Sequence, residues 1–173
     1  MTLPKGIVGV ISDTHGLIRP EALAALKGVE LIIHAGDIGK VEVLQALNAI
    51  APVCAIRGNN DRDAWAKRLP DVLNLQINGW RLCVIHNVNE FDDDPKTTRI
   101  DAVISGHSHK PSIVTREGVL FINPGSAGPR RFKLPVTVAR LQIRLGGLRS
   151  VIQDLVCDIN CLKLHQISTR VLS

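Results

Sequence analysis

Short apolar runs alternate with amphipathic segments through the first half of this 173-residue chain. The apolar runs span residues 7–11, 31–33 and 53–56 and are rich in Val and Ile. Between them, residues 20–26 and 41–50 show helical spacing, and Pro20 suits the first turn of a helix. Continuous apolar strands separated by helices are typical of parallel strands buried on both faces. We therefore predict a strand–helix–strand unit with a parallel sheet.

Three pairs of strand-like runs in the second half are separated by turn dipeptides. The dipeptides are Asn78-Gly79, Glu117-Gly118 and Gly146-Gly147, and each lies between apolar runs of hairpin length. The strands expected around them, with one further buried strand, span residues 73–77, 80–85, 102–104, 113–115, 119–122, 136–143 and 148–152. This pattern predicts a β-rich α/β domain with two sheets and outer helices.

The length and the apolar pattern indicate one domain that does not cross a membrane. A chain of 173 residues is long enough to bury a full core. No apolar run reaches the roughly 18 residues that span a bilayer. The apolar stretch at the N-terminus is short, and Asp13 and His15 follow it where a signal peptide would have small residues. We expect a cytoplasmic protein without a membrane partner.

The net charge of +5 and the pI of about 9.3 favour anionic partners such as phosphate esters. A dedicated nucleic-acid surface is not favoured, because 21 basic against 16 acidic residues is a mild excess without a long basic run. The four cysteines do not form a disulfide framework in a chain of this length. Cys54 and Cys83 lie in strand-like runs and are expected to be buried.

The last residues differ from the rest of the chain. We place the boundary of the main domain at 1–155 and treat 156–173 as a separate tail, for which no strand partner is expected. Its apolar residues fit a loose helical face or a segment that docks on a partner, and a poorly ordered terminus is equally consistent. Cys157 and Cys161 lie at i and i+4, and we expect them to be reduced.

Residues that ligate metals follow five of the predicted strands. They are Asp13, His15, Asp37, Asn59, His86, His107 and His109. In open α/β sheets, ligands bind at the carboxyl ends of the strands, so this arrangement predicts one site. His107 and His109, at i and i+2, would face the same side of an extended chain. Asp, Asn and His together suit a pair of divalent metals.

The order of these motifs, D-x-H, G-D, G-N-x-D, a lone His and G-H-x-H, resembles the calcineurin-like metallophosphoesterases. The resemblance covers roughly residues 5–155, and the small size and the GNND motif are similar to the YfcE-like phosphodiesterase branch. It implies an α/β fold, a four-layer α-β-β-α sandwich of two mixed β-sheets. It also implies a hydrolase with two divalent metal ions.

The same resemblance assigns the ligands. Asp13, His15 and His109 would hold one metal, and Asn59, His86 and His107 the other. Asp37 would bridge both, so that a bridging hydroxide attacks phosphorus in line. Asp37, Asn59 and His86 are then the catalytic residues, with Asp61 and His34 behind the ligands as supports. The mixed ligand set suits Mn²⁺, Ni²⁺, Fe²⁺ or Zn²⁺ better than Mg²⁺ and does not choose among them. We take Mn²⁺ as the first expectation and the other three as alternatives.

The substrate is expected to be a small phosphate ester. Asn60 stands where larger relatives have a histidine that protonates the leaving group, and an amide cannot do so. Activated esters should therefore be favoured. Asn60, Arg130 and Arg131 are candidate substrate contacts. Arg57 is a further candidate, because guanidinium matches phosphate geometry. Ser126 is expected to bond within its own turn.

Two other functions remain open beside the phosphodiesterase. One is a protein-interaction scaffold like the phosphoesterase-like retromer subunit, which has this fold without a fully competent metal site. All seven ligands are present here, which favours an enzyme. The other is a nuclease, which the absence of capping domains and of the catalytic histidine disfavours. A homo-oligomer is also possible.

Overall fold

The computed structural model describes residues 1–92, 99–156 and, for the backbone, 165–171. Helices and strands alternate in the first half, as predicted. The elements in this half are β1 (Ile7–Ile11), α1 (Pro20–Ala25), β2 (Leu31–His34), α2 (Val41–Asn48), β3 (Val53–Ala55) and the 3-10 helix η1 (Ala66–Arg68). Pro20 begins α1, where its missing N–H leaves no bond unmade. Helix α2 ends two residues before the predicted limit of 50, close to Pro52, which disfavours helical backbone before it.

Hairpins dominate the second half. The elements are β4 (Val72–Ile77), β5 (Trp80–Ile85), η2 (Val88–Glu90), β6 (Ala102–Ile104), β7 (Ser112–Arg116), β8 (Val119–Asn123), β9 (Thr137–Arg144), β10 (Gly147–Asp154) and β11 (His165–Val171). The three predicted hairpins are confirmed, because β4 pairs with β5, β7 with β8 and β9 with β10, all antiparallel.

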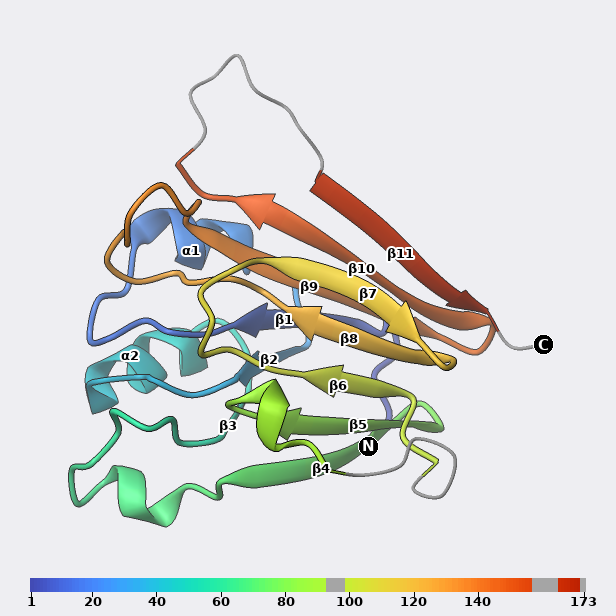
Figure 1. Ribbon diagram of the computed structural model, residues 1–173, viewed down its shortest axis with the longest axis horizontal. Helices are drawn as coiled ribbons and strands as arrows, with labels where there is room; N and C mark the ends of the chain where they lie inside the picture. Colours follow the sequence, from blue (N-terminus) through green and yellow to red (C-terminus); the bar gives the residue numbers. More distant parts are fainter. Residues whose placement is uncertain (93–98, 157–164, 172–173) are drawn as a thin grey trace.

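The strands form two mixed sheets (Figure 1). The six-stranded sheet has the order β11-β10-β9-β1-β2-β3, and the five-stranded sheet has the order β4-β5-β6-β8-β7. Strands β1, β2 and β3 are parallel, and so are β5, β6 and β8. The carboxyl ends of the parallel strands therefore lie along one edge of each sheet. The predicted fold class of two mixed sheets is confirmed.

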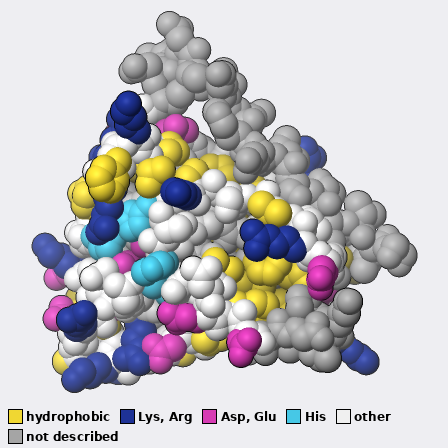
Figure 2. Space-filling model, in the orientation of Figure 1, with side chains coloured by type: hydrophobic (Ala, Val, Ile, Leu, Met, Phe, Trp, Pro, Cys, Tyr) yellow, Lys and Arg dark blue, Asp and Glu magenta, His cyan; other side chains and the backbone are white. Residues whose placement is uncertain are grey.

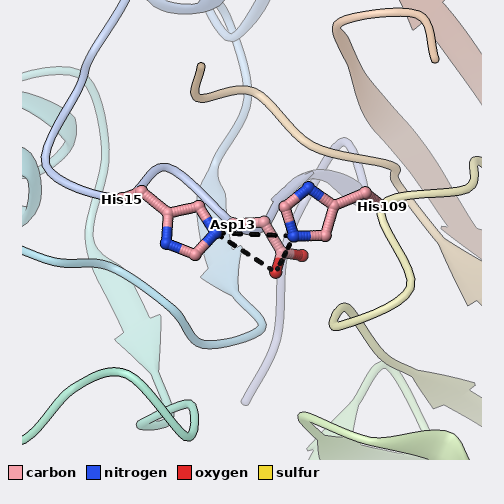
Figure 3. A group of neighbouring side chains, drawn as sticks. All are labelled: Asp13, His15 and His109. Carbon is pink, nitrogen blue, oxygen red and sulfur yellow. Dashed lines mark hydrogen bonds and ion pairs between the residues drawn. The ribbon is translucent and has the colours of Figure 1, made fainter. Parts of the chain in front are cut away.

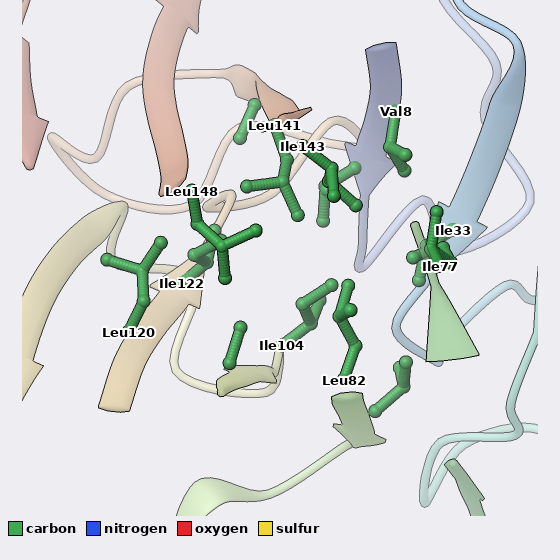
Figure 4. Packing of buried hydrophobic residues seen from close by; sticks show 14 of the residues in the cluster. Val8, Ile33, Ile77, Leu82, Ile104, Leu120, Ile122, Leu141, Ile143 and Leu148 are labelled. Atoms are coloured by element: carbon green, nitrogen blue, oxygen red, sulfur yellow. The ribbon is translucent and has the colours of Figure 1, made fainter. Parts of the chain in front are cut away.

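The main core lies between the two sheets (Figure 4). Val8 and Ile33 from the first sheet meet Leu82, Ile104 and Ile122 from the second. A second cluster lies on the other face of the six-stranded sheet, where Leu26 and Leu47 bring α1 and α2 against Ile32. Among the described residues, the outer face of the five-stranded sheet is covered by η2 and the chain beside it. The packed sheets hold the strand ends rigidly in place.

The tail departs from its prediction. Residues 165–171 form β11, which pairs antiparallel with β10 at the edge of the six-stranded sheet, so the expectation that the tail has no strand partner is wrong. A helical face is wrong for the same residues, since a strand conformation satisfies their backbone through β10. Residues 157–164, with Cys157 and Cys161, lie outside the described part. Within that part, no helix has the length and hydropathy to cross a membrane.

Candidate metal centre

The seven predicted ligands follow five strands and meet at the edge where these strands end. Asp13 and His15 follow β1, Asp37 follows β2, and Asn59 follows β3. His86 follows β5 directly. His107 and His109 follow β6, and both have positive φ (65° and 58°). The expectation of an extended chain at these two histidines is therefore wrong, because the backbone turns through the left-handed region after β6. They reach different parts of the site for this reason.

Asp13, His15 and His109 form the first group of potential ligands (Figure 3). Asp13 Oδ1 lies 3.2 Å from His109 Nε2 and 4.0 Å from His15 Nε2, and the two imidazole nitrogens are 3.4 Å apart. The other oxygen, Oδ2, accepts hydrogen bonds from Ser12 Oγ (2.6 Å) and the His107 N–H (3.0 Å). Asp13 Oδ1 is buried and has no hydrogen-bond partner. A buried carboxylate oxygen facing two imidazoles fits a cation bound among them.

Asp37, His86, Asn59 and His107 form the second group. His86 Nδ1 donates to the Ala35 carbonyl at 2.7 Å, which points Nε2 at Asn59 Oδ1 (3.2 Å) and Asp37 Oδ1 (3.6 Å). Asn59 Oδ1 also lies 3.1 Å from His107 Nδ1. A backbone carbonyl that fixes one imidazole nitrogen is the usual support for a histidine that ligates a metal through the other. These donor types suit a second divalent cation.

Asp37 lies between the two groups. Its Oδ2 faces His15 Nε2 at 3.8 Å, and its Oδ1 faces His86. Two overlapping sets of potential ligands result, one of Asp13, His15 and His109 and the other of Asp13, Asp37 and His86. Asp13 is common to these two sets, and Asp37 faces a histidine of each group. The residues present thus fit two neighbouring cations with a carboxylate between them.

Burial, hydrogen bonds and neighbouring charges shift the pKa values of Asp37, His86 and His15. Burial raises the pKa of Asp37, but hydrogen bonds from His86 and Asn60 outweigh it and hold that pKa well below its usual range. Burial lowers the pKa of His86, but the hydrogen bonds with Asp37 and Ala35 and the charges of Asp37 and Asp13 together raise it. At His15, burial dominates and lowers the pKa, against the attraction of Asp37. Asp37 is therefore a carboxylate over the whole physiological range.

The predicted supports lie behind these ligands. Asp61 accepts hydrogen bonds from the backbone N–H groups of Ile38 (3.0 Å), Gly39 (2.7 Å) and Gly58 (2.8 Å), which ties the loop after β2 to the loop after β3. His34 is fully buried, and burial lowers its pKa to about 4.

The His34 imidazole is linked to the first ligand loop through the hydroxyl group of Thr14. Thr14 Oγ1 donates to the Ile38 carbonyl, so it accepts from His34 Nε2, both at 2.9 Å. Thr14 lies between Asp13 and His15 in the chain, and His34 therefore steadies the first ligand loop without reaching a ligand.

Two glycines allow the loops to approach each other. A Cβ on Gly106 would lie 1.9 Å from Ser12 Oγ and 2.7 Å from Asp13 Oδ2. A Cβ on Gly36, which has φ +90°, would lie 2.6 Å from His86 Nδ1. Neither position accepts a side chain without moving a residue of the site.

The candidate substrate contacts have different surroundings. Asn60 donates to both oxygens of Asp37 and so lies inside the site. Arg131 Nη2 is 3.4 Å from His15 Nε2, and Arg130 is exposed on the same loop. Arg57 pairs with Asp71, so its guanidinium is already engaged. Ser126 Oγ accepts from the Gly128 N–H, as predicted for a bond within its own turn. It also donates to the Asp13 carbonyl, a bond to the first ligand loop that was not predicted.

Sequence reasoning did not identify Ser12 and Asn123 as part of the site. Asn123 Nδ2 donates to the Gly106 carbonyl at 2.6 Å and to Ser108 Oγ at 3.1 Å, which steadies the loop that carries His107 and His109. The run Asn123-Pro124-Gly125-Ser126 was the available signal, since its polar first residue is the last residue of β8 and lies at the same edge. A cleft of about 500 Å³ opens beside Asn59, His86 and His107.

Known proteins with this sequence pattern and fold are phosphoesterases or share their fold. The calcineurin-like phosphoesterase superfamily domain matches residues 7–146. A probable metallophosphoesterase of Methanothermobacter thermautotrophicus is 36% identical over 148 residues, which cover 78% of this chain and 86% of that protein.

Two solved structures have the same fold over nearly their whole length. Vacuolar Protein Sorting 29 from Cryptosporidium parvum has a TM-score of 0.78 at 18% identity and covers 96% of this chain and 98% of its own. The phosphoesterase Yfce from E. coli has a TM-score of 0.70 at 21% identity and covers 95% and 99%. With its seven motif residues gathered at one edge of the two sheets, this chain belongs to the calcineurin-like phosphoesterase superfamily.

Proposed function

We propose that this protein is a phosphodiesterase that uses two divalent cations to hydrolyse a small phosphate ester. The observation that carries the proposal is the convergence of seven Asp, Asn and His side chains from five strand ends, with the buried Asp13 Oδ1 lacking a hydrogen-bond partner. When bound, two such cations supply an activated water and neutralise the phosphoryl oxygens. Mn²⁺ is our first candidate, with Ni²⁺, Fe²⁺ and Zn²⁺ as alternatives that the ligand set also suits.

The proposal assigns each ligand a place. Asp13, His15 and His109 would hold one cation. Asn59, His86 and His107 would hold the other, and Asp37, which faces His15 and His86, would be shared. His86 is oriented for this role by the Ala35 carbonyl, and Asp37 stays ionised because its pKa is low. Fixed donors in a partly buried site need little reorganisation during the reaction, which is the main source of catalysis in phosphoryl transfer.

Among the described residues that border the ligands, Arg131 supplies a basic side chain, and Asn60 is an amide at the position where a proton donor is expected. Arg131, with its guanidinium near His15, is placed to contact a phosphoryl oxygen. Asn60 can donate a hydrogen bond to substrate but cannot release a proton. We therefore assign this site to diesters whose leaving group departs without protonation.

Hydrolysis of bis(4-nitrophenyl) phosphate tests the proposal. We expect turnover with Mn²⁺ or Ni²⁺ that is abolished by Asp37→Ala and unaffected by Glu42→Ala, which removes an exposed carboxylate on α2. Metal content is measured on the same samples. Absence of turnover with a full panel of divalent metals would reject the enzyme.

A second candidate function is a protein-interaction scaffold. The fold shared with Vacuolar Protein Sorting 29 leaves it open, because a shared fold at 18% identity does not specify an activity. Under this alternative, metal ions would stabilise the protein without turnover of any ester. The ester assay with metal-loaded protein therefore separates the two functions.

A further inference from the structure

A loop at residues 128–134 packs against the first ligand loop. A Cβ on Gly128 would lie 2.5 Å from the Asp13 and Thr14 carbonyl oxygens, so the two backbones are in close contact. The Arg19 guanidinium donates twice to the Gly128 carbonyl, both at 3.2 Å. The start of this loop is thus fixed beside the metal centre.

The tip of the loop exposes an aromatic ring. Leu134 N–H donates to the Arg131 carbonyl at 3.1 Å, which closes a turn with Phe132 at its tip, at φ 54°. The Phe132 side chain is 94% exposed, the highest value among the exposed large hydrophobic side chains of the described residues. The chain has only three phenylalanines and no tyrosine. This turn therefore holds an exposed ring next in the chain to Arg131, whose guanidinium reaches the site.

Basic side chains surround this ring. Arg131 precedes Phe132 and reaches to 3.4 Å from His15 Nε2, so the loop connects the ring to the metal centre. Arg130 and Lys133 are exposed on either side. In Figure 2, hydrophobic and basic side chains border the histidines on this face. An aromatic face beside guanidinium groups is the arrangement that binds a planar base together with its phosphate.

We propose that Phe132 is a specificity-determining residue on which the site stacks the base of a nucleoside phosphodiester. The base belongs to the alcohol that stays on phosphorus, and Arg131 contacts the phosphoryl group between the ring and the metal centre. This inference rests on the proposed function, since it names the substrate class of the same site. Dinucleotides and the ends of single-stranded oligonucleotides also carry a base next to a phosphodiester group.

Two esters with the same leaving group test the inference. Thymidine 5′-(4-nitrophenyl phosphate) carries a base, and methyl 4-nitrophenyl phosphate does not. We expect Phe132→Ala to raise the KM for the thymidine ester by about 5- to 150-fold, the equivalent of roughly 1–3 kcal/mol of stacking per base. The KM for the methyl ester and the kcat for both should stay unchanged. Phe132→Trp should retain the low KM, because it keeps an aromatic face.

A matched control is Leu145→Ala, which removes an equally apolar side chain that is 86% exposed in the turn between β9 and β10. It should leave the KM for both esters unchanged. Equal effects of Phe132→Ala on the two esters, or no effect on either, would overturn the inference.

Failure of the proposed function gives a different result. If neither ester is hydrolysed by the metal-loaded wild type, calorimetric titration with the intact thymidine ester still measures stacking. A Kd that Phe132→Ala raises 5- to 150-fold supports the inference, and an unchanged Kd overturns it.

The kind of ligand is tested separately with thymidylyl-thymidine and a single-stranded oligothymidylate as competitive inhibitors of the thymidine ester, because their alcohol leaving groups depart only with protonation. Equal inhibition constants per chain end indicate a small diester. A lower inhibition constant for the oligomer that rises steeply with salt indicates a polymer end. Phe132→Ala should raise the inhibition constant in either case, and unchanged constants for both ligands contradict the inference.

Discussion

Asn60 holds both carboxylate oxygens of Asp37. Its backbone N–H donates to Oδ1 at 2.9 Å, and its side-chain amide donates to Oδ2 at 2.6 Å. These bonds help to keep the pKa of Asp37 low and fix the plane of the carboxylate between His15 and His86. The residue predicted to contact substrate therefore also positions the carboxylate that the two cations are proposed to share.

Replacement of Asn60 by alanine should weaken metal binding. Asn60→Ala removes one of the two bonds to Asp37, and loss of a group that orients a metal ligand typically costs about 10- to 100-fold in affinity. Calorimetric titration of the apo-protein with Mn²⁺ measures the effect. Asn48→Ala, at an exposed asparagine of α2, is the control and should bind Mn²⁺ normally. An unchanged affinity with a raised KM would mean that Asn60 serves the substrate alone.

The dependence of kcat/KM on the pKa of the leaving group should show that the site lacks an acid to protonate it. For aryl methyl phosphates, we expect kcat/KM to fall steeply as the pKa of the leaving phenol rises, because an amide at position 60 cannot protonate it. Asn60→His should flatten this dependence and accelerate the poorest substrate by up to about 100-fold. Asn60→Gln keeps an amide and should keep the steep slope. The series is measured at saturating Mn²⁺, and a shallow slope in the wild type would reveal another proton donor.

Local signals in the sequence predicted most of the fold. Asn78-Gly79 specifies a tight turn through its own backbone preferences, so the β4–β5 hairpin follows from adjacent residues. β11 had no such signal, because its partner β10 is joined to it by a connection without a turn dipeptide. Edge pairing of this kind depends on the register of distant residues.

The site was predictable to a similar extent. The ligand types and their order after the strands were visible in the sequence, and the structure brings all seven residues together. The left-handed backbone of His107 was not, since it is set by contacts distant in sequence, such as its N–H bond to Asp13 Oδ2. Ser12 was missed because serine is common in loops, and its role depends on facing Asp13 Oδ2 and the Gly106 backbone.

Crowding at Gly36 should be separable from backbone strain. Gly36 and Gly79 have nearly the same φ, +90° and +88°, but a Cβ at Gly79 would meet nothing within 4 Å. Gly79→Ala should therefore cost only the left-handed penalty of about 1–2 kcal/mol in the free energy of unfolding. Gly36→Ala should cost a further ~1–3 kcal/mol, because its Cβ displaces His86, and Mn²⁺ binding should weaken with it. Urea unfolding and Mn²⁺ titration measure both, and equal costs would show that the loop accommodates the methyl group.

Buried His34 should make the apo-protein less stable in mild acid. Its pKa is lowered from 6.5 to about 4, chiefly by burial. Between these values the unfolded chain binds a proton that the folded protein does not, so the free energy of unfolding falls as the pH falls from about 6.5 to about 4, by up to about 3 kcal/mol. His34→Gln keeps an N–H donor for Thr14 and cannot titrate, so its unfolding free energy should lack this decline. Urea unfolding of both proteins in a chelator across this pH range gives the difference. Parallel pH profiles of the two proteins would show that His34 takes up its proton equally in the folded and unfolded states.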